Sequence, residues 1–225
     1  MRRYAVYGVP GADASDVADA VALYAAVQAW YGRAELQSLT VDARRYGFHA
    51  TLVAPFHLAG NHTEAELLAA VAAFAGRTTP FVIPAIRPAV MGGFRALVPG
   101  GDAGPLNALA ASVVREFDRF RAPLTEADVL RRRVDRLTDR QRQLLDRWGY
   151  PFVLDQFEFH LTLTDIVPAE RAAAVDAALA LHFAPVTALD VPLTALTISV
   201  EPQPGAPFEI LAVHPFAHSF ALEIV

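Results

Sequence analysis

A five-residue pattern occurs twice in the chain. Phe48-His49-Ala50-Thr51-Leu52 and Phe159-His160-Leu161-Thr162-Leu163 share four of their five residues and lie 111 positions apart. Residues two apart in a β-strand point to the same face, so each histidine projects beside its threonine while the apolar residues face the other way. Each copy therefore predicts a strand with one face in the core and one face that presents an imidazole and a hydroxyl.

Two such strands around one cleft would suit a phosphate ester. An imidazole titrates near neutral pH, so one histidine can take a proton from water while the other donates a proton to the leaving oxygen. The threonine hydroxyls can donate hydrogen bonds to the non-bridging oxygens. We therefore take His49 and His160 as candidate catalytic residues and Thr51 and Thr162 as candidate phosphate-binding residues. This chemistry requires no metal or other cofactor.

Other interpretations of the repeat remain open. A single His-x-Thr in a strand is usually an ordinary polar strand face, and a duplicated one is also compatible with a repeated architecture that has lost its chemistry. A non-catalytic module that binds a phosphorylated metabolite or a nucleotide would use the same cleft. In a metal-dependent hydrolase, the histidines would instead hold a cation that activates water.

Several other residues are considered and set aside. No role is assigned to the histidines that lack a repeated context, which are His57, His62, His182, His214 and His218. Tyr7 and Tyr46 could border the cleft, but burial in the core is the default for a large aromatic side chain, so neither is taken as a site residue. The arginines between positions 131 and 147 alternate with aspartates, which favours a solvated helix face over a phosphate entrance.

The remaining patterns predict an α+β protein. Strands are predicted at 4–9, 47–53, 81–89, 94–98 and 156–165 with three more towards residue 225, and helices at 15–31, 63–75, 106–120 and 168–183. Capping-box patterns at Thr63, Thr125 and Thr138 predict helix starts. We expect one bilobal domain over residues 1–225: a first lobe at about 1–124, a helical insertion at about 125–150 and a second lobe at about 151–225. Two antiparallel sheets, related by a pseudo-twofold axis and able to exchange strands between the lobes, would line a central cleft with helices outside.

Composition limits the partners. The chain has 225 residues, 54% hydrophobic and 19% charged, which is typical of a folded globular protein. The formal net charge of −5 disfavours binding to long nucleic acid, and the absence of cysteine excludes thiol nucleophiles and thiolate metal sites. No segment is apolar for long enough to predict a membrane span or a signal peptide. We expect a cytoplasmic protein with a small phosphorylated ligand and no membrane partner; the oligomeric state is left open.

With these motifs the chain resembles the two-histidine (2H) phosphoesterase superfamily, whose hallmark is one His-x-Thr/Ser-x motif in each of two similar α+β lobes. Within that superfamily it is most similar to a group of phosphonate metabolism proteins. The likeness covers much of residues 46–165 and is weaker at Arg3-Tyr4-Ala5-Val6-Tyr7. It includes Tyr46-Gly47-Phe48-His49-Ala50-Thr51-Leu52, Ala96-Leu97-Val98-Pro99, Phe120-Arg121-Ala122-Pro123-Leu124, the arginines 131–133, and 137–150 on to the second motif.

The resemblance implies a hydrolase, a cyclic phosphodiesterase that opens a small ribose- or nucleoside-type cyclic phosphate, with His49 as acid and His160 as base. The chain departs from the group at Val53 and Glu158, where the group tends to have a lysine and an arginine. By strand alternation both positions are expected on the faces of the catalytic pairs. The loss of two positive charges leaves a phosphorylated ribose cyclic phosphate and a nucleoside 2',3'-cyclic phosphate as competing substrates.

Overall fold

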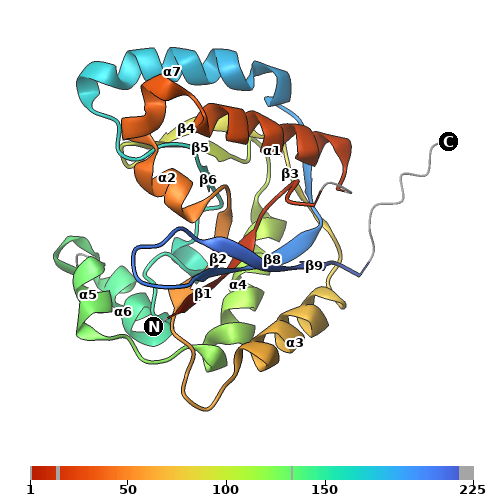
Figure 1. Ribbon diagram of the computed structural model, residues 1–225, viewed down its shortest axis with the longest axis vertical. Coiled ribbons are helices and arrows are strands. Elements are labelled where there is room, and N and C mark those ends of the chain that lie inside the picture. Colours follow the sequence, from red (N-terminus) through yellow and green to blue (C-terminus); the bar gives the residue numbers. More distant parts are fainter. Residues whose placement is uncertain (1, 14–15, 133, 218–225) are drawn as a thin grey trace.

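The computed structural model describes residues 2–13, 16–132 and 134–217. Within these residues the strands form three antiparallel sheets, with the orders β2-β1-β8-β9, β3-β7 and β4-β5-β6 (Figure 1). Helices pack against the sheets. The predicted α+β class is confirmed.

The four-stranded sheet joins the two ends of the chain. β1 (Arg3–Gly8) lies between β2 (Ala50–Phe56) and β8 (Ala195–Glu201), and β9 (Glu209–Pro215) pairs with the other side of β8. All of β1 after its first residue is buried, as expected for a central strand. The helices α3 (Glu64–Ala75) and α4 (Gly104–Phe117) pack against this sheet and lie below it in Figure 1.

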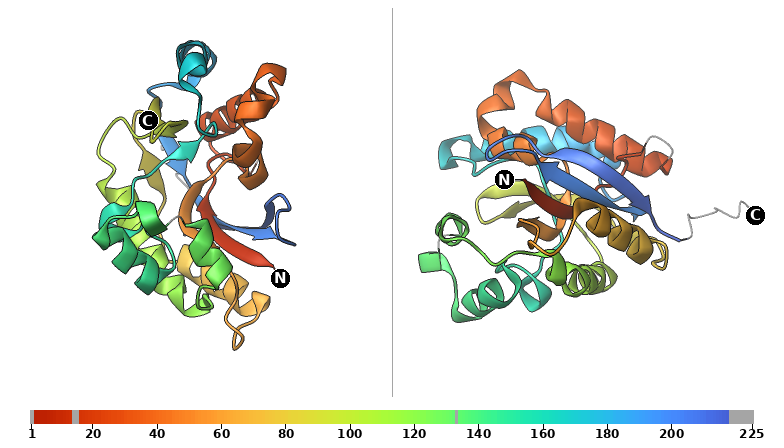
Figure 2. Two further views of the ribbon diagram at one scale, coloured as in Figure 1. Left: turned by 90° about the vertical axis from the view of Figure 1, so that its left-hand side faces the viewer. Right: turned by 60° about the horizontal axis from the view of Figure 1, so that its bottom comes forward.

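The two smaller sheets also combine strands from both halves of the sequence. The hairpin of β4 (Arg87–Met91) and β5 (Phe94–Val98) pairs with β6 (Leu161–Thr162), and β3 (Phe81–Ile83) pairs with β7 (Val191–Leu193). Helices α1 (Ala18–Tyr31) and α7 (Ala169–Phe183) pack against each other on this side of the molecule (Figures 1 and 2). Most of the buried apolar residues form one continuous core that includes both motifs.

The predicted helix starts are confirmed. In all three capping boxes the threonine hydroxyl accepts a hydrogen bond from the backbone three residues later: Thr63 begins α3, Thr125 begins α5 (Glu126–Arg131) and Thr138 begins α6 (Asp139–Trp148). The remaining helical elements are α2 (Val41–Tyr46) and short 3₁₀ turns at Ala34–Leu39, Asp118–Phe120, Val134–Arg136, Leu154–Gln156 and Ala184–Val186.

Three predicted elements are shorter in the structure. The strand expected at 81–89 is two strands, because Pro84 has no amide donor for a ladder and Ala85 turns the chain at φ 45°. The strand expected at 156–165 pairs only at Leu161 and Thr162. The helix expected from residue 15 begins at Ala18, and residues 14–15 lie outside the described part. Among the described residues, no helix has the length and apolar character needed to cross a membrane.

Candidate functional site

The two motifs alternate as predicted. In the first copy Phe48, Ala50 and Leu52 are at most 4% exposed, and in the second Phe159, Leu161 and Leu163 are buried to the same degree. Each histidine and each threonine is partly exposed on the opposite side. The apolar side chains anchor both segments in the core, and the histidine and threonine of each motif are left accessible.

One cavity of about 390 Å³ collects all four predicted site residues. His49, Thr51, His160 and Thr162 line it together, and we call it the two-histidine cleft. His49 immediately precedes β2 at the edge of the four-stranded sheet, and His160 immediately precedes β6 at the edge of the three-stranded sheet. Residues that are 111 positions apart in sequence therefore share one site through the meeting of two sheet edges.

The two imidazoles are held in matching ways. Nδ1 of His49 lies 2.9 Å from the carbonyl oxygen of Gly47, and Nδ1 of His160 lies 2.8 Å from the carbonyl oxygen of Glu158. A carbonyl oxygen only accepts, so Nδ1 carries the proton in both rings and Nε2 is the atom free for chemistry. At the first site Gly47 adopts φ 75° where α2 ends, a conformation that favours glycine.

The Nε2 atoms differ between the two rings. Nε2 of His49 lies 3.1 Å from the hydroxyl oxygen of Thr51, which donates to it in this tautomer. In the described part of the chain, Nε2 of His160 has no hydrogen-bond partner. His160 therefore presents an open acceptor to the cleft, whereas the acceptor of His49 is engaged by its own threonine.

Helix α1 positions the second motif, whose strand has only two paired residues. The indole Nε1 of Trp30 donates to the backbone carbonyl oxygen of Leu163 at 3.0 Å. The hydroxyl of Tyr31 donates to the backbone carbonyl oxygen of Thr162 at 2.6 Å. The amide of Leu163 donates to the carbonyl oxygen of Arg95 on β5. These bonds satisfy backbone groups that a longer sheet would pair.

Aromatic side chains that the sequence interpretation placed in the core border the cleft instead. The Tyr7 ring stacks on the His49 ring with centroids 3.9 Å apart, and the Tyr46 ring lies 6.2 Å from it. The centroids of the Phe94 and His160 rings lie 5.6 Å apart. Tyr7 is both buried and on the cleft wall, so its predicted burial is confirmed and the alternative position, which the sequence did not favour, is also found.

Burial controls the protonation of both histidines. Desolvation lowers the pKa of His49 to about 4, against the opposing effect of its hydrogen bond to Gly47, and the charge of His160 lowers it further. Desolvation also lowers the pKa of His160, while the hydrogen bond to the Glu158 carbonyl and the Glu158 carboxylate act in the raising direction. Both rings are thus mainly neutral in the empty cleft near pH 7.

These pKa shifts predict a pH-dependent stability. A histidine whose pKa is lower in the folded than in the unfolded protein contributes stability above pH 6.5 that is lost as the pH falls towards 4. We expect the unfolding free energy to fall by about 1–2 kcal/mol between pH 7 and pH 5 on account of His49. Urea denaturation at both pH values measures it. His49→Gln, which does not titrate, should show a smaller drop, and an equal drop in both proteins would contradict the assignment.

Val53 and Glu158 do not line the two-histidine cleft, although the charge of the Glu158 carboxylate acts on the pKa of His160. Val53 packs beside Trp148 and Tyr150 in a small neighbouring cavity, and Glu158 borders another cavity with Phe157. The bulge between β1 and β2 lies at this point of the ladder, which changes the neighbours of Val53. Glu158 acts on the His160 ring through its backbone carbonyl and through the charge of its carboxylate.

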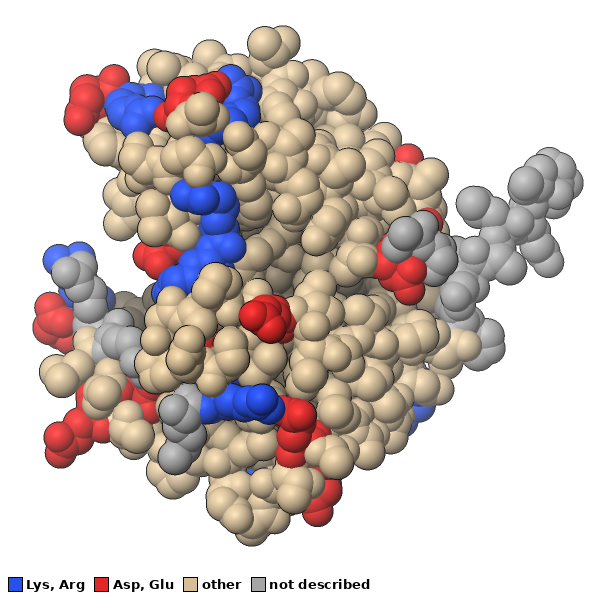
Figure 3. Space-filling view, in the orientation of Figure 1, with Lys and Arg blue, Asp and Glu red and all other residues tan. Residues whose placement is uncertain are grey.

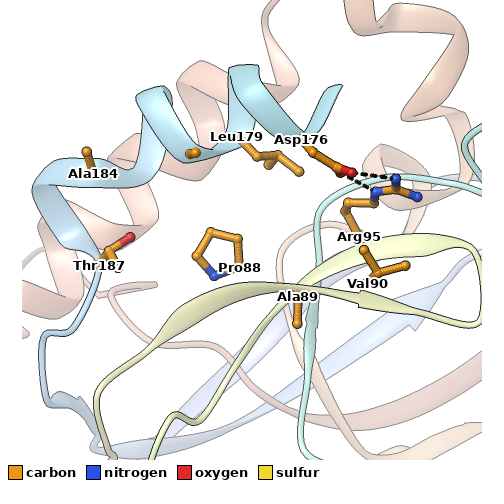
Figure 4. A pocket seen from close by; sticks show the side chains of 9 residues that line it. Pro88, Ala89, Val90, Arg95, Asp176, Leu179, Ala184 and Thr187 are labelled. Carbon is orange, nitrogen blue, oxygen red and sulfur yellow. Dashed lines mark hydrogen bonds and ion pairs between the residues drawn. The ribbon is translucent and has the colours of Figure 1, made fainter. Parts of the chain in front are cut away.

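A second cavity, of about 510 Å³, lies between α7 and β4 (Figure 4). Its walls are mostly apolar, and its arginine is already paired: Nε of Arg95 lies 2.7 Å from the Asp176 carboxylate. It holds neither motif. On the face drawn in Figure 3, arginines and acidic side chains are interspersed, with no continuous basic surface of the kind that a long polyanion needs.

Comparisons with known proteins place the chain in a family. The model of a family described as protein of unknown function (DUF1045) matches residues 51–209. A protein of Janthinobacterium sp. (strain Marseille), named ribose 1,5-bisphosphate phosphokinase PhnN, is 43% identical over 177 residues, which are 77% of this chain and 39% of that protein. A protein of the same name from Laribacter hongkongensis (strain HLHK9) is 36% identical over 168 residues, 75% of this chain and 38% of its own length.

The chain therefore spans about two fifths of the length of these curated relatives. A solved structure described as a phosphoesterase aligns over 96% of this chain and 99% of its own, with 13% identity and a TM-score of 0.45, a likeness too distant to carry an argument. The family match and the relatives named PhnN confirm the predicted resemblance to a phosphonate metabolism group. Because the family model covers well over half of its residues, the chain belongs to the family described as protein of unknown function (DUF1045).

Proposed function

We propose that this protein is a cyclic phosphodiesterase that opens a small ribose- or nucleoside-type cyclic phosphate by paired-histidine acid/base catalysis. The observation that carries the proposal is the matched pair of imidazoles at one cavity, each with Nδ1 fixed by the carbonyl oxygen two residues before it. This arrangement leaves both Nε2 atoms for proton transfer. Thr51 and Thr162 line the same cavity with hydroxyls that suit non-bridging phosphate oxygens.

The reaction needs one base and one acid. In the proposed step Nε2 of His160 removes a proton from water, the water oxygen bonds to phosphorus, one ester P–O bond breaks, and Nε2 of His49 protonates the departing oxygen. The open Nε2 of His160 favours it as the base. His49 becomes charged when the substrate anion enters, and its low pKa makes it a strong proton donor. Proton exchange with solvent then resets both rings.

The relatives suggest the chemical class of the substrate. They carry the name ribose 1,5-bisphosphate phosphokinase, and opening the ring of a phosphorylated ribose cyclic phosphate yields a ribose bisphosphate. The phosphokinase activity itself is not carried over, because this chain spans only about two fifths of the length of these relatives. A cavity of about 390 Å³ is in the range that accommodates a small ligand. We place the reaction in phosphonate metabolism on the group resemblance.

A panel of cyclic esters tests the proposed function. Ribose cyclic phosphates with and without a 5-phosphate, nucleoside 2',3'-cyclic phosphates and an acyclic diester are incubated with the protein and followed by phosphorus NMR. We expect ring opening to a monoester, at an unchanged rate in excess chelator. Binding of the cyclic esters without turnover would indicate a binding module. Activity that is lost in chelator and restored by a divalent ion would replace the mechanism with a metal-dependent one.

A further inference from the structure

One arginine of the helical insertion lies on the wall of the two-histidine cleft. Arg132 follows α5 and lines the same cavity as the two histidines. Its guanidinium carbon lies 4.7 Å from the centroid of the Tyr150 ring, and Tyr7 and Tyr46 line the cavity as well. This position differs from the solvated helix face predicted for the arginines of the insertion. Contact with solvent therefore does not account for the charge of Arg132.

Several other arginines of this region have carboxylate partners. In and beside the insertion, Arg140 pairs with Asp155, and Arg121 and Arg147 pair with Asp118. Arg95, the arginine of the second cavity, pairs with Asp176. The guanidinium of Arg132, by contrast, makes no hydrogen bond or ion pair within the described residues. Desolvation lowers the pKa of Arg132 by more than Tyr150, Tyr46 and Asp128 raise it, so its surroundings do not fully offset the partial burial of the cation.

A second polar group on the same wall also lacks a partner. Tyr7 is only 1% exposed, and its buried hydroxyl neither donates nor accepts a hydrogen bond within the described residues. A buried hydroxyl without a partner is costly, so such groups usually mark a place where another molecule completes the bonding. Tyr7 and Arg132 line the same cavity, so the two unsatisfied groups belong to one site.

We propose that Arg132 and Tyr7 form a second anion subsite, which binds the phosphate group of the substrate that does not react. This inference rests on the proposed function and specifies its substrate. A guanidinium matches phosphate oxygens in a fork, and a phosphate supplies the negative charge that the buried cation lacks. A nucleobase could stack on the tyrosines of this wall but would leave the charge of Arg132 uncompensated. The subsite therefore favours a ribose cyclic phosphate with a second phosphate over a nucleoside 2',3'-cyclic phosphate.

The test compares two substrates that differ only in the 5-phosphate of a ribose cyclic phosphate. For Arg132→Gln we expect KM to rise by about 10–100-fold for the phosphorylated substrate and by less than about threefold for the other. Tyr7→Phe, which removes only the hydroxyl, should raise the first KM several-fold. Arg140→Gln is the matched control, because Arg140 belongs to the same insertion and pairs with Asp155 outside the cleft. Equal losses on both substrates in Arg132→Gln would overturn the subsite.

Binding of ribose 5-phosphate, measured by calorimetry, separates this inference from the proposed function. Wild-type protein that binds ribose 5-phosphate but opens no cyclic ester would contradict the function, and weaker binding by Arg132→Gln would then still support the subsite. Ring opening by a wild-type protein that shows no preference for the 5-phosphate would leave the function in place and reject the subsite. Circular dichroism and the thermal midpoint of each variant report on its folding.

Discussion

Replacing either histidine of the cleft with alanine is expected to lower turnover of the cyclic phosphodiester by about 10²-fold or more, because each imidazole supplies one of the two proton transfers. Binding of the monoester product should change little, since the threonine hydroxyls and the cavity walls remain. Steady-state kinetics of His49→Ala and His160→Ala on the best substrate of the panel measure the first effect, and calorimetry with the product measures the second.

The double variant and a distant histidine sharpen this expectation. The effects of substituting residues that act as a unit are not additive. The double variant His49→Ala, His160→Ala should therefore have a turnover rate only slightly below that of the slower single variant. His57 is the matched control: its Nδ1 bonds to the carbonyl oxygen of Arg2, and it does not line the cleft. If His49→Ala or His160→Ala keeps turnover within a few-fold of wild type while folding normally, the paired-histidine mechanism is wrong.

Local sequence patterns predicted the parts of the fold that are determined locally. The capping boxes at Thr63, Thr125 and Thr138 begin helices because both partners of each box lie within one turn. The alternation of buried apolar residues with accessible polar residues around His49 and His160 is also found, since it depends only on the two-residue period of an extended chain. The repeat added long-range information, because two closely similar motifs suggest equivalent places on either side of an axis.

Features that depend on distant neighbours were missed. The Tyr7 ring stacks on His49 because β1 pairs with β2 at Tyr7 and Thr51, a register that no local pattern fixes. Arg132 stands in a run of charges typical of a solvated helix, and only the tertiary fold turns it to the cleft. The strand expected at 156–165 is largely irregular because α1, rather than a neighbouring strand, satisfies the carbonyls of Thr162 and Leu163.

The two threonines should not be equivalent, although they occupy the same position in the two motifs. The Thr51 hydroxyl lies 3.1 Å from Nε2 of His49, so it both orients the imidazole and faces the cavity. The Thr162 hydroxyl makes no hydrogen bond within the described residues and is free to donate to a phosphate oxygen. Loss of the Thr51 hydroxyl should therefore also alter the protonation of His49, and loss of the Thr162 hydroxyl should not.

Threonine-to-valine substitutions test this difference, because valine keeps the β-branched shape and removes only the hydroxyl. We expect Thr51→Val and Thr162→Val each to lower kcat and kcat/KM by about 10–10²-fold, since hydrogen bonds that strengthen in the transition state affect both parameters equally. Thr51→Val should also shift the pH profile of kcat/KM. Serine at either position should restore most of the activity. Thr187→Val should have no effect, because the Thr187 hydroxyl donates to the carbonyl oxygen of Phe183 and the residue lines the second cavity, not the two-histidine cleft. Activity within twofold of wild type in both valine variants would remove the threonines from phosphate binding and leave the role of the histidines intact.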